Sequence, residues 1–133
     1  MYNINQIALC KQIIEVLKEE DKTCTQNKIE KTLQKKGVII THDGLHVVLE
    51  FLLNEGYITK AFNIQSKYWF YSHIEKAFTY DDYISVKEFA SKLFYCPVTT
   101  RTYIKIGRIS DYIKIGRKFY INQSELENQK LLG

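Results

Sequence analysis

Residues 83–129 read YISVKEFASKLFYCPVTTRTYIKIGRISDYIKIGRKFYINQSELENQ, and within them the hexapeptide Tyr-Ile-Lys-Ile-Gly-Arg occurs twice, at Tyr103–Arg108 and at Tyr112–Arg117. β-Branched and aromatic residues have no overwhelming preference for helix, so the tertiary context decides the conformation of such a string. We therefore predict different structures for the two copies. The first ends a helix at Gly107, and the second forms a strand that turns back at Gly116.

Capping signals and apolar spacing predict what surrounds the repeat. Ser85 starts a Ser-x-x-Glu box with Glu88, and the apolar residues that follow predict a helix through about Phe94. Pro97 suits the first turn of the next helix, which is predicted at Val98–Ile106. Two helices separated by a very short turn, followed by a hairpin, are therefore expected.

Positive charge is concentrated in the same region. The 133-residue chain has a net charge of +4, whereas Val98–Ile121 alone contains six Lys or Arg residues against the single acid Asp111. Such a patch attracts polyanions through counterion release but carries little sequence information by itself. On charge alone, a solvated basic surface remains an alternative to nucleic-acid binding.

These features together resemble the excisionase-type helix-turn-helix domain, which is related to the DNA-binding part of MerR regulators. The matching strings are Ser85–Ala90 as the opening helix, Gly107–Ile109 after the recognition helix, Lys114–Phe119 as the wing and Ser124–Leu126 at the start of a closing helix. The chain departs from the family at Phe94, where a small turn residue is common, and at Cys96-Pro97, which replaces the usual polar cap.

The resemblance implies a DNA-binding surface in this half of the chain. Outward residues of the second helix would meet the major groove, and residues after this helix and in the wing would meet phosphate or the minor groove. The residues implied to bind DNA are Thr99, Arg101, Thr102, Lys105, Arg108, Lys114, Arg117 and Lys118.

The first half of the chain has helical spacing followed by aromatic-rich strands. The predicted elements are a helix from Ile4 to about Glu19, a helix opened by Thr23 and closed by Gly37, a brief strand at Val38–Ile40, a helix from Thr41 to Gly56, and a hairpin of Tyr57–Phe62 with Lys67–Tyr71. Capping residues define the helix boundaries, because Thr accepts hydrogen bonds at a helix start and Gly adopts the conformation that ends a helix.

Three helices followed by a hairpin resemble the winged-helix domains of bacterial regulators over Ile4–Ser72. In that family the third helix usually enters the major groove and the hairpin touches the backbone. Here the third helix, Thr41–Gly56, has three acids and no Lys or Arg, which makes it a poor phosphate reader. We expect this half to dimerise or to bind another protein, with its wing, through Lys60 and Lys67, as its contact to nucleic acid.

Histidine and aromatic residues of this half have two interpretations each. His42 and His46 lie four residues apart, a spacing that can hold a metal, but no third ligand is evident, so surface or capping histidines are favoured. Trp69 and its aromatic neighbours suit base stacking, but alternate residues of a strand are needed for the core, which is the favoured interpretation.

Several classes of protein are not supported. The three cysteines are widely spaced without a Cys-x-x-Cys pair, which predicts buried free thiols rather than disulfides or a zinc site. We find no nucleophile, phosphate-loop or metalloenzyme motif and no run of eighteen apolar residues. The expectation is a cytoplasmic protein without enzymatic activity, metal, cofactor or membrane contact.

The sequence thus predicts an α+β, mainly α, chain of two small tandem winged helix-turn-helix domains. Residues 1–74 form the first domain, residues 75–82 a connector, and residues 83–133 the DNA-binding domain. One function that fits is an excisionase-like architectural factor or small regulator of a mobile element. The alternative is an accessory subunit that binds a polymerase, primase, helicase or recombinase through the first domain and directs it to DNA.

Overall fold

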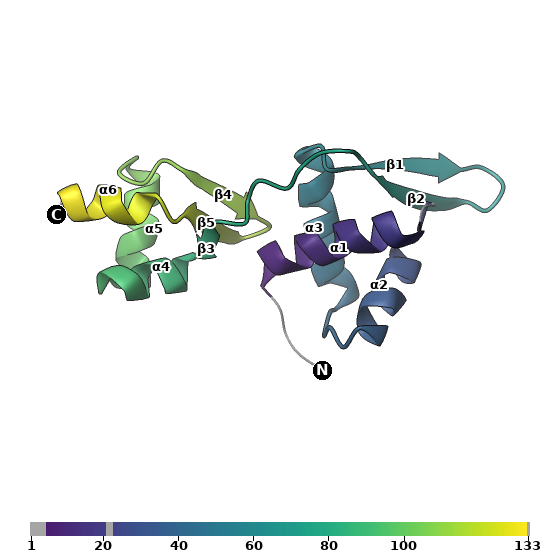
Figure 1. The fold of residues 1–133 in the computed structure, drawn as a ribbon, viewed down its shortest axis with the longest axis horizontal. Coiled ribbons are helices and arrows are strands. Elements are labelled where there is room, and N and C mark those ends of the chain that lie inside the picture. The colour runs from purple at the N-terminus through teal and green to yellow at the C-terminus, as the bar shows by residue number, and fades with distance from the viewer. Residues whose placement is uncertain (1–4, 21–22, 133) are drawn as a thin grey trace. The chain divides into compact units, whose positions relative to one another are not determined.

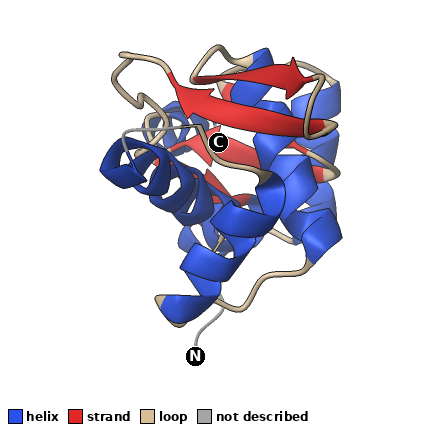
Figure 2. Cartoon of the chain, turned by 90° about the vertical axis from the view of Figure 1, so that its right-hand side faces the viewer, coloured by secondary structure: helices blue, strands red, loops and turns tan. Residues whose placement is uncertain are grey.

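The chain folds into two compact units. The computed structural model describes residues 5–20 and 23–132 and divides the chain into unit 1, Met1–Phe78, and unit 2, Thr79–Gly133. In the described residues each unit combines helices with a small antiparallel sheet, so the fold class is α+β, as predicted (Figure 1, Figure 2). The boundary between the units falls within the connector expected at 75–82.

Three helices enclose the apolar core of unit 1. They are α1 (Gln6–Glu20), α2 (Gln26–Lys35) and α3 (His42–Asn54). All three were predicted, although Ile4, the expected start of the first, lies outside the described residues. The inward faces bury Ile13, Leu17, Ile29, Leu33, Leu45, Leu49 and Leu52. Each such burial stabilises the unit by about 1.5–3 kcal/mol, and the apolar spacing of the helices is the reason that these residues meet.

The start of α2 differs from the prediction. Its N-cap is Thr25, whose hydroxyl accepts a hydrogen bond from the Lys28 amide at 3.3 Å, so the cap predicted at Thr23 is wrong. The intervening Cys24 exchanges backbone hydrogen bonds of 2.9 and 2.7 Å with Tyr71 in the hairpin. This pairing holds the chain extended at Cys24, and the helix can begin only after it.

Helix α3 is bounded by the residues that the sequence indicated. The Thr41 hydroxyl accepts a hydrogen bond from the Gly44 amide at 3.0 Å, and Gly56, with φ 78°, follows the C terminus. The brief strand predicted at Val38–Ile40 is wrong, because these residues form a single bridge position and no strand. Of these three residues only Val38 takes a bridge position, and the apolar character of the triplet carries no information about a partner strand.

Unit 1 ends in a β-hairpin. Its strands are β1 (Ile58–Asn63) and β2 (Tyr68–His73), which pair antiparallel. Lys60 lies opposite Tyr71, and Phe62 lies opposite Trp69. Paired residues share a face of the hairpin, so the face that buries Tyr71 beside the helices continues outward through Lys60 and Trp69 to Phe62.

Unit 2 is a three-stranded antiparallel sheet with three helices in its described residues. In chain order its elements are β3 (Tyr83–Ser85), α4 (Val86–Leu93), α5 (Pro97–Lys105), β4 (Tyr112–Ile115), β5 (Lys118–Asn122) and α6 (Glu125–Leu132). Strand β5 lies between β3 and β4. The two helices, the hairpin and the closing helix were predicted, whereas β3 was not, because three residues carry no readable alternation and their partner strand is distant in sequence.

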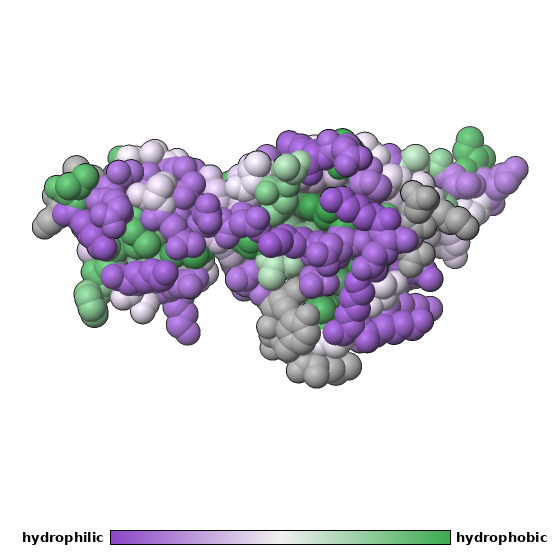
Figure 3. Space-filling model, in the orientation of Figure 1, coloured by the Kyte–Doolittle hydropathy of each residue, from purple (hydrophilic) through white to green (hydrophobic). Residues whose placement is uncertain are grey.

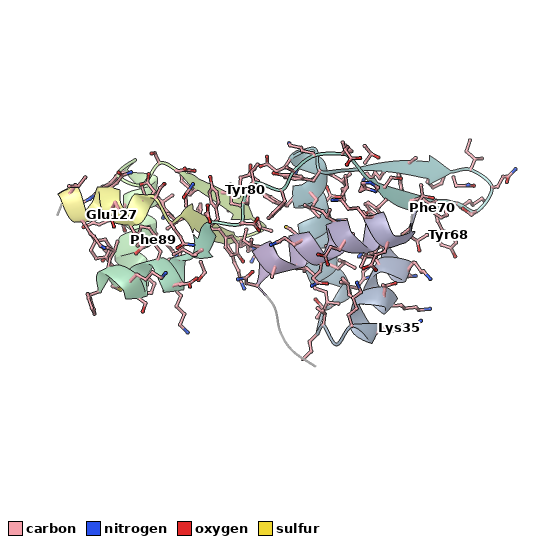
Figure 4. All side chains as sticks on the ribbon, viewed as in Figure 1. Lys35, Tyr68, Phe70, Tyr80, Phe89 and Glu127 are labelled. Carbon is pink, nitrogen blue, oxygen red and sulfur yellow. The ribbon has the colours of Figure 1, made fainter. Side chains whose placement is uncertain are left out.

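One apolar cluster holds unit 2 together. Phe89 of α4, labelled in Figure 4, is fully buried. It packs with Ile104 of α5, with Ile109 and with Ile121 of β5. Partly buried residues close the edges of the cluster: Leu93, Tyr103, Phe119 and Leu126. Residues from both helices, the sheet and α6 thus share one core.

The two copies of the repeated hexapeptide adopt different structures, as predicted. In the first copy the residues through Lys105 belong to α5, and Gly107 follows with φ 83°. In the second, Tyr112–Ile115 is β4, and Gly116, with φ 62°, begins the turn into β5. Both glycines occupy the left-handed region, which a residue with a Cβ rarely adopts.

The turn between α4 and α5 contains a strained position. Phe94 has φ 58°, and its side chain is 97% exposed. This backbone conformation costs a residue with a Cβ about 1–2 kcal/mol. The Tyr95 amide closes the end of α4 by donating a 2.8 Å hydrogen bond to the Ala90 carbonyl. A phenylalanine therefore occupies, without burial, a position that glycine would fill at lower conformational cost.

The cysteines differ in exposure: Cys10 and Cys24 are buried, but Cys96 is exposed. The prediction of a buried thiol is therefore wrong for Cys96, which lies in the short turn before α5. Burial raises the pKa of the Cys10 thiol to about 12 from 9.0. Since the folded pKa is the higher one, the stability that neutral Cys10 contributes is complete below pH 9 and is lost as the pH rises towards 12.

We expect a maleimide at neutral pH to label the folded protein once, at Cys96, because the other two thiols are excluded from solvent. Mass spectrometry of the intact protein would count the labels, with all three thiols reacting in denaturant. Cys96→Ser should remove the label from the folded protein. Two or more rapid labels on the native chain would contradict the burial of Cys10 and Cys24.

Candidate nucleic-acid interface

The outward face of α5 is a continuous stripe of exposed side chains. Val98, Arg101, Thr102 and Lys105 are spaced at i, i+3, i+4 and i+7, which places them on one side of the helix, and all four are exposed. Thr100 and Ile104 are buried on the opposite side. We call the four exposed residues the α5 stripe.

The membership of the α5 stripe differs from the prediction at one residue. Thr99, expected to face outward, is half-buried, and Val98 is 64% exposed. The helix begins at Pro97, so Val98 is its second residue and lies one turn before Arg101. The resemblance implied a groove contact for Thr99, but the spacing of four from Val98 to Thr102 was a signal that could have identified the valine.

The turn between β4 and β5 presents the cations that the resemblance assigns to a wing, and we call this turn the wing. Arg117 and Lys118 are exposed at this turn, and buried Ile115 anchors the strand that leads into it. Lys114 is also exposed, with its Nζ 5.4 Å from the centroid of the Phe119 ring on the opposite strand. The Phe119 ring thus supports the Lys114 side chain, and the three cations Lys114, Arg117 and Lys118 face solvent.

A pocket of about 380 Å³ joins the wing to α5. It is lined by Ser85, Val86, Lys87, Arg101, Arg117, Lys118, Phe119 and Tyr120. Four of these described residues are cations and none is an acid, so we call this feature the basic pocket. Cations that converge from three separate segments repel one another, and an anion bound among them relieves that repulsion.

Lys87 is a member of the basic pocket that the sequence did not indicate. It is the second residue of α4 and is exposed. The sequence placed it in the opening helix, away from the groove-facing helix and the wing. Because β3 pairs with β5, the start of α4 is carried to the strand that leaves the wing, and this pairing is what adds Lys87 to the pocket.

Arg108, expected to contact phosphate or the minor groove, is largely engaged within unit 2. Its Nε donates a 3.0 Å hydrogen bond to Gln129 Oε1, and its Cζ lies 4.4 Å from the centroid of the Tyr103 ring. The Gln129 amide in turn donates to the Arg108 carbonyl at 3.0 Å. These contacts join α6 to the segment after α5, so Arg108 positions the C-terminal end of α5.

Asp111, the single acid among residues 98–121, is directed into the sheet. Its carboxylate accepts hydrogen bonds from the Tyr83 hydroxyl and, at 3.0 Å, from the Asn122 side-chain amide. It therefore ties β3 to the end of β5 and does not line the basic pocket. The positive charge of the pocket is left without a lining carboxylate.

The N-terminal wing cations occupy different environments. Lys60 Nζ lies 4.8 Å from the centroid of the Trp69 ring and 3.9 Å from a carboxylate oxygen of Glu50 on α3. Lys67 is exposed at the hairpin turn, with φ 61°. Glu50 of α3 thus partly neutralises Lys60.

The aromatic residues of β2 are mostly outside the core, which corrects the interpretation favoured from the sequence. Trp69 is 49% and Tyr68 60% exposed, and only Tyr71 is buried. The helices cover the base of the hairpin and leave its outer half uncovered, so alternation alone did not bury these rings. Figure 3 shows an exposed hydrophobic group at the end of the hairpin on the right, where Ile64 is 82% exposed.

A second pocket, of about 440 Å³, lies beside the same hairpin. Its lining residues are Thr25, Gln26, Asn27, His42, His46, Lys60, Tyr68, Trp69 and Tyr71. His42 Nδ1 lies 3.5 Å from a carboxylate oxygen of Glu30, and His46 Nε2 lies 3.8 Å from a carboxylate oxygen of Glu50. Among the residues that the structure describes, no group of three or more His, Cys, Asp or Glu side chains could hold a metal ion.

Comparison of the chain with protein-family models, with curated proteins and with solved structures gave no match. In the described part of the chain, no helix is sufficiently long and apolar to cross a membrane.

Proposed function

We propose that this chain is a DNA-binding protein without enzymatic activity, and that unit 2 contacts duplex DNA as a winged helix-turn-helix. The observation that carries the proposal is the basic pocket, where Lys87 of α4, Arg101 of α5 and the wing cations Arg117 and Lys118 converge. DNA phosphates are anions that such a cluster favours. Each phosphate that a cation neutralises releases counterions, so the gain in affinity grows with the number of contacts.

The α5 stripe supplies side chains that can contact base edges, which a phosphate site alone lacks. The major groove of B-DNA admits an α-helix, and Arg and Thr side chains can read base edges there. In the proposed complex Arg101, Thr102 and Lys105 approach the bases, and the wing holds the backbone. This arrangement matches the helix-and-wing docking expected from the resemblance to excisionase-type domains.

The two halves of the interface should give different mutant phenotypes. Lys105 lies at the end of the α5 stripe, whereas Lys118 lies in the wing turn. We expect Lys105→Ala to alter base preference and Lys118→Ala to weaken binding evenly across sequences, since phosphate contacts carry no direct sequence information. Selection from a labelled random duplex library, with affinities of the recovered sequences for each variant, measures both effects.

Exposed Lys92 on α4, which does not line the basic pocket, provides the control. Lys92→Ala should retain the base preference and nearly all the affinity. If Lys105→Ala and Lys118→Ala both lose affinity evenly, α5 does not read bases and the division between helix and wing is wrong.

Within this function, the role of an excisionase-like architectural factor or of a small regulator depends on what binding does to DNA. An architectural factor bends its site, and a regulator need not. Placing a selected site at different positions along a fragment and comparing gel mobilities distinguishes the two, because only a bent complex changes mobility with position.

One observation favours a second candidate, an accessory subunit that brings a replication or recombination enzyme to DNA. Unit 1 exposes Phe62, Ile64, Tyr68 and Trp69 on a single hairpin, and exposed apolar groups of this kind mark protein interaction sites. Purification of the protein from its native host tests this role. Recovery alone, without any polymerase, primase, helicase or recombinase, would count heavily against it.

A further inference from the structure

The N-terminal end of the α5 stripe is apolar, although the rest of the stripe is polar or cationic. Val98 is 64% exposed and gains little from packing within unit 2. Valine also has a lower helix propensity than alanine or lysine, so local stability does not explain it. The exposed valine one turn from Arg101 is therefore free of contacts within the core and accessible to a ligand of α5.

Thr102 adds a second methyl group to the same surface. Its hydroxyl donates a 3.0 Å hydrogen bond to the Val98 carbonyl, so its polar group is already used inside the helix. Thr102 follows Val98 by four residues, and the two side chains are neighbours along the stripe. Together they form an apolar step flanked by the cations Arg101 and Lys105.

The ligand that fits this step must be negatively charged overall and present small apolar groups at the contact. Among the four bases, thymine alone places a methyl group in the major groove, and valine or threonine methyl groups can contact it. The flanking cations and the basic pocket favour the phosphate chains beside that groove. A purely apolar protein surface would leave these cations without partners.

We infer that Val98 and Thr102 contact thymine methyl groups and thereby determine part of the DNA sequence that the protein prefers. The inference rests on the proposed function, since it requires α5 to lie in the major groove of a duplex. It goes further by assigning one base type to two residues, one of which, Val98, carries no charge and no hydrogen-bonding side chain.

The test removes methyl groups from each side of the contact: one from thymine or from Thr102, and two from Val98. Duplexes are first selected from a random library with the full-length protein, and each thymine of a selected duplex is then replaced in turn by deoxyuridine. At one or two positions we expect the wild-type affinity to fall about threefold to fivefold, the effect of one buried methyl group. Val98→Ala or Thr102→Ser should lower affinity for the thymine duplex and abolish the discrimination at one such position.

Leu131→Ala is the matched control, because Leu131 is 86% exposed on α6 and outside the stripe. It should leave the discrimination between thymine and deoxyuridine intact. All these side chains are exposed, so circular dichroism should report unchanged folding for every variant.

Three results overturn the inference while duplex binding persists. They are a selected motif without thymine, equal wild-type affinity for thymine and deoxyuridine at every position, and discrimination that survives both variants. In the last case, loss of self-association or of a co-purifying protein in Val98→Ala would assign the apolar step to a protein contact. Failure of the full-length protein to bind any duplex overturns the proposed function itself, and the inference with it.

Discussion

Replacing Arg101 and Lys118 together with alanine is expected to weaken binding to a selected duplex by about a hundredfold, because each lost charge-assisted contact costs roughly 1–2 kcal/mol. The two cations line the basic pocket from different elements, one on α5 and the other in the wing turn. The slope of log affinity against log salt should also fall by about 1, since Lys118 contacts phosphate whereas Arg101 approaches the bases. Fluorescence anisotropy with a labelled duplex over a range of salt concentrations measures both quantities.

The matched control removes the same charge from elsewhere on unit 2. Lys92 on α4 and Lys130 on α6 are exposed and do not line the basic pocket, and Lys130 lies 3.4 Å from Glu127. Lys92→Ala with Lys130→Ala should change affinity less than about threefold, as expected for surface charges at a distance. Equal losses for the two double variants would mean that net charge alone drives binding and that the basic pocket is not the site.

Phe89→Ala is the substitution with the largest expected effect on stability. Phe89 is fully buried at the centre of the core of unit 2, and truncating such a side chain costs about 3–5 kcal/mol. A unit of this size has a total stability of only a few kcal/mol, so most molecules should lose the fold of unit 2 and with it duplex binding. In a two-dimensional amide NMR spectrum, the signals of Thr79–Gly133 should collapse while those of unit 1 persist.

The chain provides a control with the same chemical change. Phe94 is 97% exposed, so Phe94→Ala removes no core contact and should change the free energy of unfolding by less than about 0.5 kcal/mol. In unit 1, Leu49→Ala should have the reciprocal effect, since Leu49 is fully buried in the other core. Simultaneous loss of both units in either buried variant would show that the two cores are not independent.

Local signals explain the parts of the fold that could be predicted. Thr41 and Ser85 cap the helices that follow them because a side-chain oxygen can reach an amide three residues on, whatever the rest of the chain does. Gly107 and Gly116 have positive φ, which the residue type itself favours. These interactions span a few residues, so the sequence alone contains the information needed to place them.

The missed features depend on contacts between distant segments. Cys24 pairs with Tyr71 and moves the start of α2 from Thr23 to Thr25. Trp69 is exposed because the helices of unit 1 do not extend along the whole hairpin. Neither the partner of a bridge nor the length of a hairpin beyond its supporting helices can be read from periodicity, which reports only which residues share a face.

By itself the sequence determined the secondary structure around the repeated hexapeptide and the concentration of positive charge there, because both follow from residue type and order. Only the tertiary structure decided which cations meet. Pairing of β3 with β5 adds Lys87 to Arg101 and the wing, while Gln129 holds Arg108 against Tyr103 and Asp111 turns into the sheet. The physical reason is that charge adds up along a sequence, but a binding site depends on distances in space, and these are set by packing between segments far apart in the chain.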